Sequence, residues 1–482
     1  MACTTILVGR KASYDGSTII ARNDDGMFEA KKVIVTTSDK QFKKYKSKIG
    51  HLEIELPKNP LKYTSIPNID KTRGLWPACG INEANVSMTA TETITSNPLV
   101  YAADPLVRYE KAKSKKEKDK IGGIGEEDLV TLVLPYIKTA REGVIRTGKL
   151  LEKYGTYEMN GMAFADEKEI WWLETIGGHH YIAVRVPDDE VVMMPNRFGL
   201  DHFDLNDALG KQTNNMCSKD MKEFIKNNHL DANNNGKFNP RLVFGSHSDS
   251  DHIYNTPRSW YMLKYFAPRK YDFDKDYTPI SDDIPFSVKP EKKVTIEEVK
   301  YILNSYFQGT DYDPYLKTDV AGKYRTIGVP NTDCCGILQI RGYMPKPIQA
   351  VQWLSLGGST FTACIPMYTN VSRFPKFYSQ GSSKPSTDDY YWASRLIAAL
   401  TDANYDKASI EDERYQNKVL FEGSRILKEY DDKMLKSKKY TDCEEANEKI
   451  SAMLQKESTE ALGKILKIAS VNMKTMYHRG DN

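Results

Sequence analysis

A cysteine stands at the third position of the chain and is followed directly by strand-forming residues, in MACTTILVG. If Met1 and Ala2 were removed, Cys3 would carry a free α-amine with a pKa of about 7.7 to 8.0, beside a thiol whose ordinary pKa is about 8.5. One residue would then supply both a nucleophile and a proton acceptor, as in enzymes whose attacking group is activated by an N-terminal amine. The opening residues therefore predict nucleophilic catalysis by Cys3.

Such a nucleophile needs a cation that favours the thiolate, an acceptor for its ammonium group and donors for an oxyanion. The segment ARNDD ends the second strand of a predicted hairpin, and an antiparallel return brings that end beside Cys3. We expect Arg22 to lower the pKa of the thiol and Asp25 to accept a hydrogen bond from the ammonium group. On residue types alone, an ion pair on the hairpin surface is the simpler explanation of Arg22 and Asp25.

Other catalytic signatures, such as GxSxG, HExxH, a Walker loop or GxGxxG, are missing from the sequence. The run LDANNNGKFN (230–239) begins like a calcium loop, but Leu242 stands where a bidentate Glu is needed, which favours an Asn-Gly turn. The adjacent residues His179 and His180 should point to opposite faces, which favours hydrogen-bonded packing over metal binding. We therefore expect neither a metal nor a cofactor.

The elements that must position Cys3 indicate an α+β protein. The hairpin is predicted over 4–9 and 18–23, around the Asp-Gly turn of SYDGS. Apolar patterning predicts further elements, namely a helix within 126–155 that ends at a glycine, a three-stranded meander over 161–196, a sheet segment over 348–368, and helices from about 386 to about 473.

Composition narrows the class of protein. The 482 residues include 68 Lys and Arg against 65 Asp and Glu, a near balance that argues against nucleic acid as the main partner. No run of about 18 apolar residues and no basic-then-apolar leader is present, so we expect no membrane span and a cytoplasmic location. The seven cysteines are an odd number without CxxC repeats, which favours reduced thiols.

The opening, C-T-T-I-L-V-G…D-G-S-T…A-R-N-D-D, resembles the start of the bacterial dipeptidase A family, of the lactobacillar type, in the N-terminal nucleophile hydrolase superfamily. The resemblance continues, in the order of the family, over nearly the whole chain. Its further blocks are GINEANVSMTATET (80–93), EEDLVTLVLPYIKTAREGV (126–144), IWWLETIGGHHYIAVRVPDDEVVMMPNRF (170–198), SHSDSDHIYNTPRSW (246–260) and WLSLGGSTFTACIPMY (353–368).

The resemblance implies roles for individual residues. Cys3 matches the nucleophile, and Arg22 and Asp25 match the Arg-Asn-x-Asp pattern of the related bile-salt hydrolases and penicillin acylases. Asn196, in MMPNRF, is similar to their asparagine beside the reacting amine, and Arg258, in NTPRSW, is similar to their distal arginine. The structural alternatives are a turn asparagine for Asn196 and a salt bridge for Arg258.

One block departs from those amidases, which place an oxyanion-hole asparagine ten residues after the Asn of their G-x-N-E block. Counting from Asn82 gives Glu92, so Thr91, Glu92 or a backbone amide must fill that site here. A carboxylate near the pocket suits a substrate with a free ammonium group. We therefore expect Thr91 and Glu92 to bind substrate.

The fold implied by the resemblance is a four-layer αββα sandwich with a helical C-terminal region. Residues 1–2 would be a removed propeptide and 3–385 the hydrolase core, with a Lys-rich loop at 107–125 and an insertion at 200–250; residues 386–482 would form helices packed on the core. An aminopeptidase would remove Met1, and the thiol itself would cleave Ala2–Cys3 by an N-to-S shift.

The implied activity is that of a cysteine dipeptidase: Cys3 attacks a dipeptide carbonyl, its amine transfers the proton, and water hydrolyses the thioester without a metal. Dipeptides are then the expected partners, and a homo-oligomer is compatible with the sequence. One alternative is a non-peptide amidase or acylase of the bile-salt hydrolase or penicillin acylase type. Another is a catalytically silent binding protein, similar to the secernin branch.

Overall fold

The computed structural model describes residues 3–110, 113–114, 120–232, 237–358 and 360–473. The proposed propeptide, the turn expected at 233–236 and residues 111–112 and 115–119 of the Lys-rich loop lie outside the described residues. None of the helices described combines the length and the apolar character needed to cross a membrane.

Two antiparallel sheets form the centre of the molecule. The first runs in the order β16 (Ser287–Val288), β14 (Val191–Met194), β1 (Thr4–Val8), β2 (Thr18–Asp25), β17 (Thr332–Ile340), β18 (Ala350–Leu356) and β19 (Ile365–Tyr368). The second runs in the order β15 (Asn215–Cys217), β13 (His180–Arg185), β12 (Ile170–Ile176), β11 (Asn160–Ala165), β8 (Ser87–Thr93) and β7 (Cys79–Ile81).

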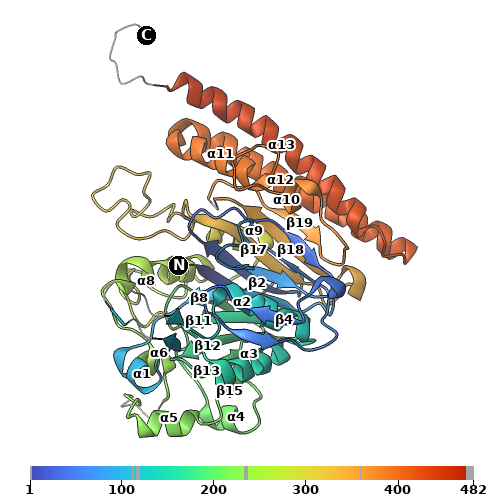
Figure 1. Cartoon of the computed structure of the whole chain (residues 1–482). Helices are drawn as coiled ribbons and strands as arrows, with labels where there is room; N and C mark the ends of the chain where they lie inside the picture. The colour runs from blue at the N-terminus through green and yellow to red at the C-terminus, as the bar shows by residue number, and fades with distance from the viewer. Residues whose placement is uncertain (1–2, 111–112, 115–119, 233–236, 359, 474–482) are drawn as a thin grey trace.

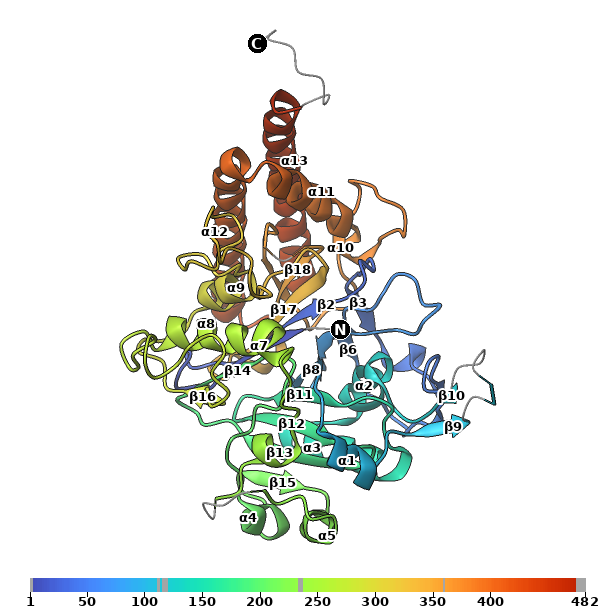
Figure 2. The ribbon, with the colours of Figure 1, turned by 90° about the vertical axis from the view of Figure 1, so that its left-hand side faces the viewer.

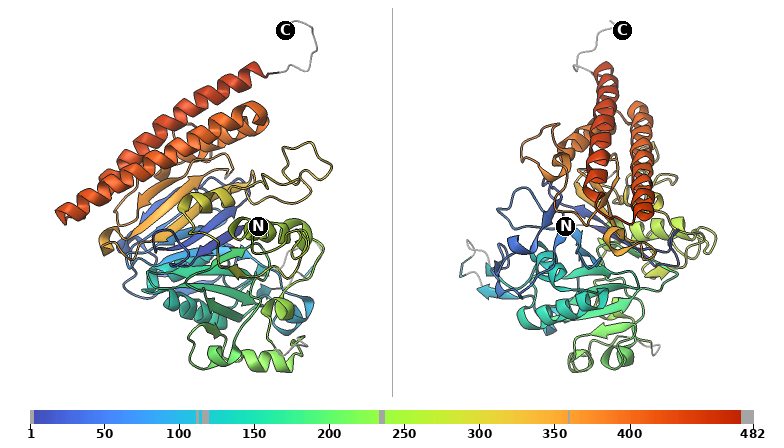
Figure 3. Two further views of the ribbon diagram at one scale, coloured as in Figure 1. Left: turned by 180° about the vertical axis from the view of Figure 1, so that it is seen from behind. Right: turned by 90° about the vertical axis from the view of Figure 1, so that its right-hand side faces the viewer.

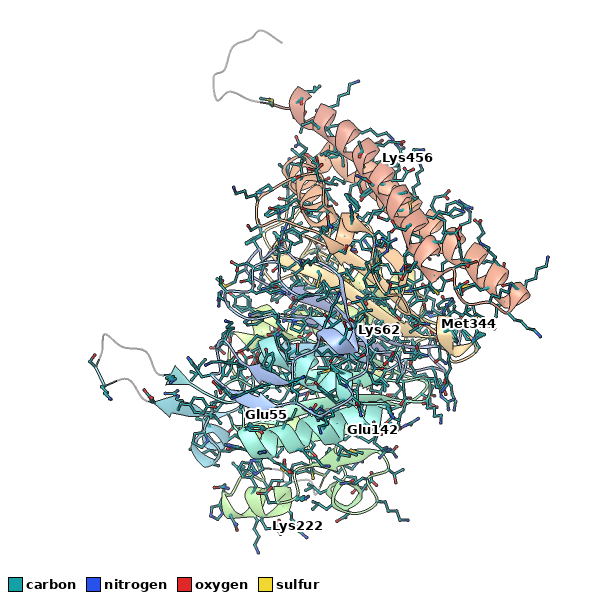
Figure 4. All side chains as sticks on the ribbon, turned by 45° about the vertical axis from the view of Figure 1, so that its right-hand side comes forward. Glu55, Lys62, Glu142, Lys222, Met344 and Lys456 are labelled. Atoms are coloured by element: carbon teal, nitrogen blue, oxygen red, sulfur yellow. The ribbon has the colours of Figure 1, made fainter. Side chains whose placement is uncertain are left out.

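The two sheets face each other, because β2 and β17 of the first sheet contact β8 of the second (Figure 1). Helices cover both outer faces. The second sheet carries α2 (Glu126–Val133) and α3 (Ala140–Tyr154), while the first carries α9 (Ile296–Leu303), α11 (Tyr390–Ala403), α12 (Tyr405–Ser437) and α13 (Cys443–Val471). In Figure 4, Lys456 on α13 and Glu142 on α3 mark these two outer layers. A mixed α/β fold with a helical C-terminal region is thus confirmed.

Short elements lie around these layers. They are β3 (Ile34–Thr36), β4 (Lys44–Lys46), β5 (Glu53–Glu55), β6 (Tyr63–Ser65), α1 (Pro98–Ala103), β9 (Arg108–Glu110), β10 (Lys120–Ile121), α4 (Leu205–Leu209), α5 (Met221–Asn227), α6 (Pro240–Phe244), α7 (Asp251–Tyr254), α8 (Thr256–Phe266) and α10 (Lys376–Ser379). Of these, α8 packs on β14 of the first sheet (Figure 2), and its Arg258 contacts Cys3 and Thr4 at the start of β1.

The predicted hairpin is confirmed, and it lies in the middle of the first sheet rather than on the surface. β1 and β2 pair antiparallel, with Thr4 opposite Asn23 and Thr5 opposite Arg22. β14 and β17 flank the hairpin, and every residue of both hairpin strands is buried. Cys3 therefore lies beside Asp24, at the end of a strand that is held on both sides.

Two predicted elements were wrong in detail. The helix expected within 126–155 is two helices, because Pro135 cannot continue a helix and the chain turns before α3. The meander expected over 161–196 contains four strands, of which three stay together while β14 crosses to the first sheet and pairs with β1. The predicted glycine end of the helix is confirmed, since Gly155 follows α3 with a positive φ of 64°.

The adjacent histidines also differ from expectation. The imidazole rings of His179 and His180 do not diverge, because each places Nδ1 on the carboxylate of Asp104, at 2.8 and 2.6 Å. His179 lies in the turn before β13, so strand alternation does not apply to it. The preference for hydrogen-bonded packing is confirmed.

The C-terminal helices are tied to the sheet by a buried ion pair. In both views of Figure 3, α12 and α13 run side by side as two long helices, and both contact β19 of the first sheet. Asp431, on α12, accepts hydrogen bonds from Arg341 at 2.5 and 3.1 Å and from the Tyr368 hydroxyl at 2.7 Å. Arg341 directly follows β17 and Tyr368 ends β19, so this cluster joins helix α12 to two strands of the sheet.

We predict that Asp431→Asn destabilises the protein by about 3–5 kcal/mol, because it leaves the buried Arg341 guanidinium without its counter-charge. Asp432→Asn is the matched control, since Asp432 is exposed and, in the described part of the chain, pairs only with the exposed Lys428. Urea unfolding of both variants measures the effect. Equal midpoints for the two variants would contradict the assignment.

Candidate active site

The thiol of Cys3 is fully buried and lies against a guanidinium group. Nη2 of Arg22 lies 2.9 Å from the sulfur, and Oδ1 of Asp24 lies 4.0 Å from it. Cys3 and Arg22 meet because neighbouring strands of the hairpin place them on one face: Thr5 stands opposite Arg22, and Cys3 is two residues from Thr5. The prediction that Arg22 lies at the thiol is confirmed in position.

Arg22 is held by groups from both sheets and from a helix. Its Nη1 donates to the carbonyl of Ala78 at 3.1 Å and to the carbonyl of Ala90, and its Nη2 donates to Asp24 at 2.8 Å. Nη2 also donates to Glu126, in the first turn of α2, at 2.5 Å. These contacts fix the guanidinium plane while one of its nitrogens faces the sulfur.

A second buried arginine holds the backbone of Cys3. Nη1 of Arg258, from α8, donates to the Cys3 carbonyl and, at 2.7 Å, to the hydroxyl of Thr4. Its Nη2 donates to Oδ1 of Asn196 at 2.8 Å and to Asn255 at 2.7 Å. Arg258 and Asn196, both named from the sequence, are therefore brought together at Cys3.

Glu92 joins this group from the second sheet. It accepts a hydrogen bond from the Thr5 hydroxyl at 2.6 Å and another from Nδ2 of Asn196 at 3.3 Å. The neighbouring residue, Thr91, is buried and its hydroxyl has no hydrogen-bond partner among the described residues. Both residues expected to bind substrate therefore lie on the strand whose Ala90 carbonyl contacts Arg22.

Asp25 lies at the same end of the hairpin but bonds to a different set of residues. It forms an ion pair with Arg325 and accepts a hydrogen bond from the Thr332 hydroxyl at 2.5 Å. Asp24, its neighbour, faces Arg22 instead and also pairs with Lys31 at 2.7 Å. Strand alternation explains the difference, because residues 22 and 24 share a face and residue 25 does not. The expected contact of Asp25 with a free ammonium group stays a prediction.

Burial dominates the electrostatics of the site. It raises the pKa of the Cys3 thiol, an effect that Arg22 opposes and that the nearby carboxylates reinforce. Burial also raises the pKa of Glu92 to about 8, although Arg22, Thr5 and Arg258 act in the opposite direction. For Arg258, burial lowers the pKa well below its usual range, and the neighbouring Arg325 adds to this effect. Of these three groups, Glu92 is the one whose pKa lies near neutral pH.

Among the residues that the structure describes, one set of side chains has donor atoms close enough to hold a metal ion. These are Cys3, Asp24 and Glu126, whose ligand atoms all lie within 4.8 Å of one another. The same three atoms surround Nη2 of Arg22, which contacts each of them. A guanidinium therefore supplies the positive charge among these groups.

Sequence reasoning missed four charged residues of this network: Asp24, Lys31, Glu126 and Arg325. Alternation along the second strand could have identified Asp24, because it shares a face with Arg22. The other three come from segments distant in the chain, and only the packing of the two sheets and their loops brings them to the hairpin.

The profile of Peptidase family C69 matches residues 2–418. A dipeptidase of Bifidobacterium longum is 52% identical over 447 residues, covering 90% of this chain and 83% of its own length. A probable dipeptidase A of Streptococcus pyogenes is 46% identical with full coverage of both chains, and dipeptidase A of Lactobacillus helveticus is 41% identical over 96% of each. The chain belongs to Peptidase family C69, and the predicted family resemblance is confirmed.

We predict that Arg22→Gln slows alkylation of Cys3 by iodoacetamide about tenfold or more at pH 7, because the thiolate loses the cation 2.9 Å away. The chain would be expressed without Ala2, so that removal of Met1 alone exposes Cys3. Intact mass measures the rate, and a Cys3→Ala chain identifies labelling of the six other cysteines.

Arg10→Gln is the matched control for this prediction. Arg10 follows the first strand of the same hairpin, but its side chain is 44% exposed and pairs with Asp188. If Arg22→Gln reacts as fast as this control, Arg22 has no electrostatic effect on the thiol.

Proposed function

We propose that the protein is a cysteine dipeptidase whose nucleophile is Cys3, exposed as the first residue by removal of Met1 and Ala2. The observation that carries the proposal is that two buried arginines bind Cys3: Arg22 donates to the sulfur and Arg258 donates to the carbonyl. The names of the relatives support the choice of dipeptides as substrates.

The reaction follows from the groups at Cys3. The free α-amine takes the proton of the thiol, and the sulfur attacks the dipeptide carbonyl to form a tetrahedral intermediate. The same proton passes to the leaving nitrogen, the C–N bond breaks, and the C-terminal amino acid departs. Water then hydrolyses the thioester, with the amine again accepting a proton. Arg22 stabilises the thiolate, and Asp25 and Asn196 orient the amine.

The oxyanion of the intermediate needs donors that are fixed before the reaction. The unpartnered hydroxyl of Thr91 supports a role for that residue, because a buried hydroxyl without a partner costs free energy unless a ligand supplies one. Arg258, which already donates to the Cys3 carbonyl, keeps the backbone of the nucleophile in place.

Glu92 is suited to bind the ammonium group of a dipeptide. Its carboxylate lies between Thr5 and Asn196, close to the start of β1, and no lysine or arginine is hydrogen-bonded to it in the described part of the chain. This role distinguishes a peptidase from an amidase that takes acyl groups without a charge, and it is the reason for preferring dipeptides over non-peptide amides.

The proposal extends to the fold and the compartment. Two sheets pack face to face, and helices cover the outer face of each. This order of layers supports assignment as the four-layer αββα sandwich of N-terminal nucleophile hydrolases. A cytoplasmic location is supported by the seven cysteines, all free and buried, because disulfides are rare in reducing compartments.

We predict that purified, active protein lacks Met1 and Ala2, and that Cys3→Ala retains Ala2 and hydrolyses no dipeptide. Intact-mass spectrometry and a ninhydrin assay with Ala-Ala measure the two effects. EDTA should leave the activity unchanged, while iodoacetamide should abolish it. Full activity in a chain that still bears Met1 and Ala2 would overturn the proposal, and faster release of acyl groups from model amides would favour the acylase alternative.

We predict that Glu92→Gln raises KM for Ala-Ala about tenfold or more, because a charge-assisted hydrogen bond to the ammonium group is lost. Since the pKa of Glu92 is about 8, its carboxylate forms as the pH rises from 6 to 8. The ratio of kcat/KM between wild type and variant should therefore increase over that range, by up to about tenfold per pH unit. A ratio that does not change with pH would exclude this role of Glu92.

A further inference from the structure

A large cavity is lined by Arg325, the ion-pair partner of Asp25, and has no role in the reaction described above. It has a volume of about 1010 Å³, at the upper end of the roughly 300–1,000 Å³ that small-molecule sites occupy. Its walls are rich in aromatic side chains, contributed by Phe28, Tyr306, Tyr315, Tyr324, Phe361 and Trp392. Such a lining favours a bulky apolar group rather than water.

The cavity adjoins the nucleophile end of the hairpin. Arg325 lines it and forms an ion pair with Asp25, the last residue of β2, which directly follows Asp24 beside Cys3. On the same side, Pro330 lines the cavity one residue before Asn331, whose carbonyl accepts a hydrogen bond from Gly26 at 2.9 Å. The wall of the cavity is therefore joined to Asp25 and Gly26, the two residues that follow Asp24 in the chain.

The charged side chains around the cavity include groups that can bind the carboxylate end of a dipeptide. Its charged lining residues in the described part of the chain are Arg325, Arg395 and Asp402. Asp402 accepts a hydrogen bond from the Tyr315 hydroxyl at 2.5 Å, and Arg395 lies 4.8 Å above the ring of Phe28. Both guanidinium groups also pair with a buried carboxylate, Arg325 with Asp25 and Arg395 with Asp333 at 3.0 Å, so a substrate carboxylate would share them with these groups. A guanidinium has five N–H donors and recognises carboxylates well.

We propose that this cavity binds the C-terminal residue of the dipeptide, with the substrate carboxylate toward Arg325 and Arg395 and a large apolar or aromatic side chain between the aromatic walls. The inference rests on the proposed function, because only a peptide substrate has such a residue. Glu92 and Arg325 then bind opposite ends of the substrate, and the enzyme prefers dipeptides that are large and apolar at their second position.

Steady-state kinetics of the processed wild-type enzyme test the inference with four substrates: Ala-Ala, Ala-Phe, Phe-Ala and the C-terminal amide of Ala-Phe. We expect kcat/KM for Ala-Phe to exceed that for Ala-Ala about tenfold or more, because a phenyl group leaves water for an apolar cavity. Relative to Ala-Ala, kcat/KM should rise less for Phe-Ala than for Ala-Phe. The amide should have a kcat/KM at least about tenfold lower than that of Ala-Phe, since it lacks the carboxylate.

Cavity variants keep the test specific. Ala399 lies on the exposed side of α11 and lines the cavity, so Ala399→Trp should fill it without disturbing the core. We expect this variant to lower kcat/KM for Ala-Phe at least about tenfold and to lower that for Ala-Ala by a clearly smaller factor, because a methyl side chain needs less of the cavity than a phenyl group. Leu396→Ala should also lower activity on Ala-Phe; Leu209→Ala is its matched control, because both leucines are 41% exposed and only Leu396 lines the cavity.

The outcomes separate this inference from the proposed function. If wild-type enzyme hydrolyses Ala-Ala but prefers Phe-Ala, or if Ala399→Trp lowers activity on Ala-Ala and Ala-Phe equally or on neither, the inference is wrong and the dipeptidase function stands. Equal rates for Ala-Phe and its amide would likewise exclude recognition of the carboxylate. If no dipeptide is hydrolysed, both proposals fall.

Discussion

The guanidinium of Arg22 is the interaction on which the site depends. It is 2% exposed, and a charge this deeply buried is tolerated only when opposite charges and hydrogen-bond acceptors surround it. Its partners come from its own strand, from the second sheet and from helix α2. The contacts that hold Arg22 against the thiol therefore also link the two sheets and helix α2. The same residues serve both the geometry of the site and the packing of the core.

Arg22 and Arg258 approach the first strand from different directions. Arg22 shares a face with Thr5, whereas Arg258 bonds to the hydroxyl of Thr4, which projects from the other face. The backbone of Cys3 is fixed between them. A chain of hydrogen bonds runs from Arg258 through Asn196 and Glu92 to Thr5, on the same strand as Cys3. Because each group bonds to two others, displacement of one of them weakens the hold on the nucleophile as well.

Local patterns predicted the parts of the fold that depend on neighbouring residues. The hairpin at 4–23, the glycine end of α3 and the long C-terminal helices all follow from turn chemistry and apolar spacing. The placement of β14 in the first sheet could not be predicted in this way, because pairing with β1 joins segments almost 200 residues apart and its strand pattern is the same in either sheet. The break at Pro135, by contrast, follows from proline geometry alone.

The residues of the site likewise differ in whether a local sequence pattern could predict them. Cys3 and Arg22 were predictable from residue type and hairpin geometry, and Asn196, Arg258, Thr91 and Glu92 came from family resemblance rather than from physical reasoning. Glu126, Lys31 and Arg325 carry no local signal, since a buried ion pair looks like any other charged residue until its partner is known. Asp24 was within reach of strand alternation, which assigns it, and not Asp25, to the face of the thiol.

Burial explains why the position of Cys3 in the sequence matters for its chemistry. A buried thiol keeps its proton even beside Arg22, because loss of water disfavours the thiolate more than one guanidinium can offset. The cation alone therefore does not activate the sulfur, and a proton acceptor must lie within the site. Glu92 and the α-amine of a processed Cys3 are the groups with a suitable pKa, and only the amine belongs to the same residue as the sulfur. In the unprocessed chain that nitrogen is a peptide nitrogen and accepts no proton. The proposed cleavage before Cys3 is thus the step that supplies the base, and a chain that still carries Ala2 lacks it.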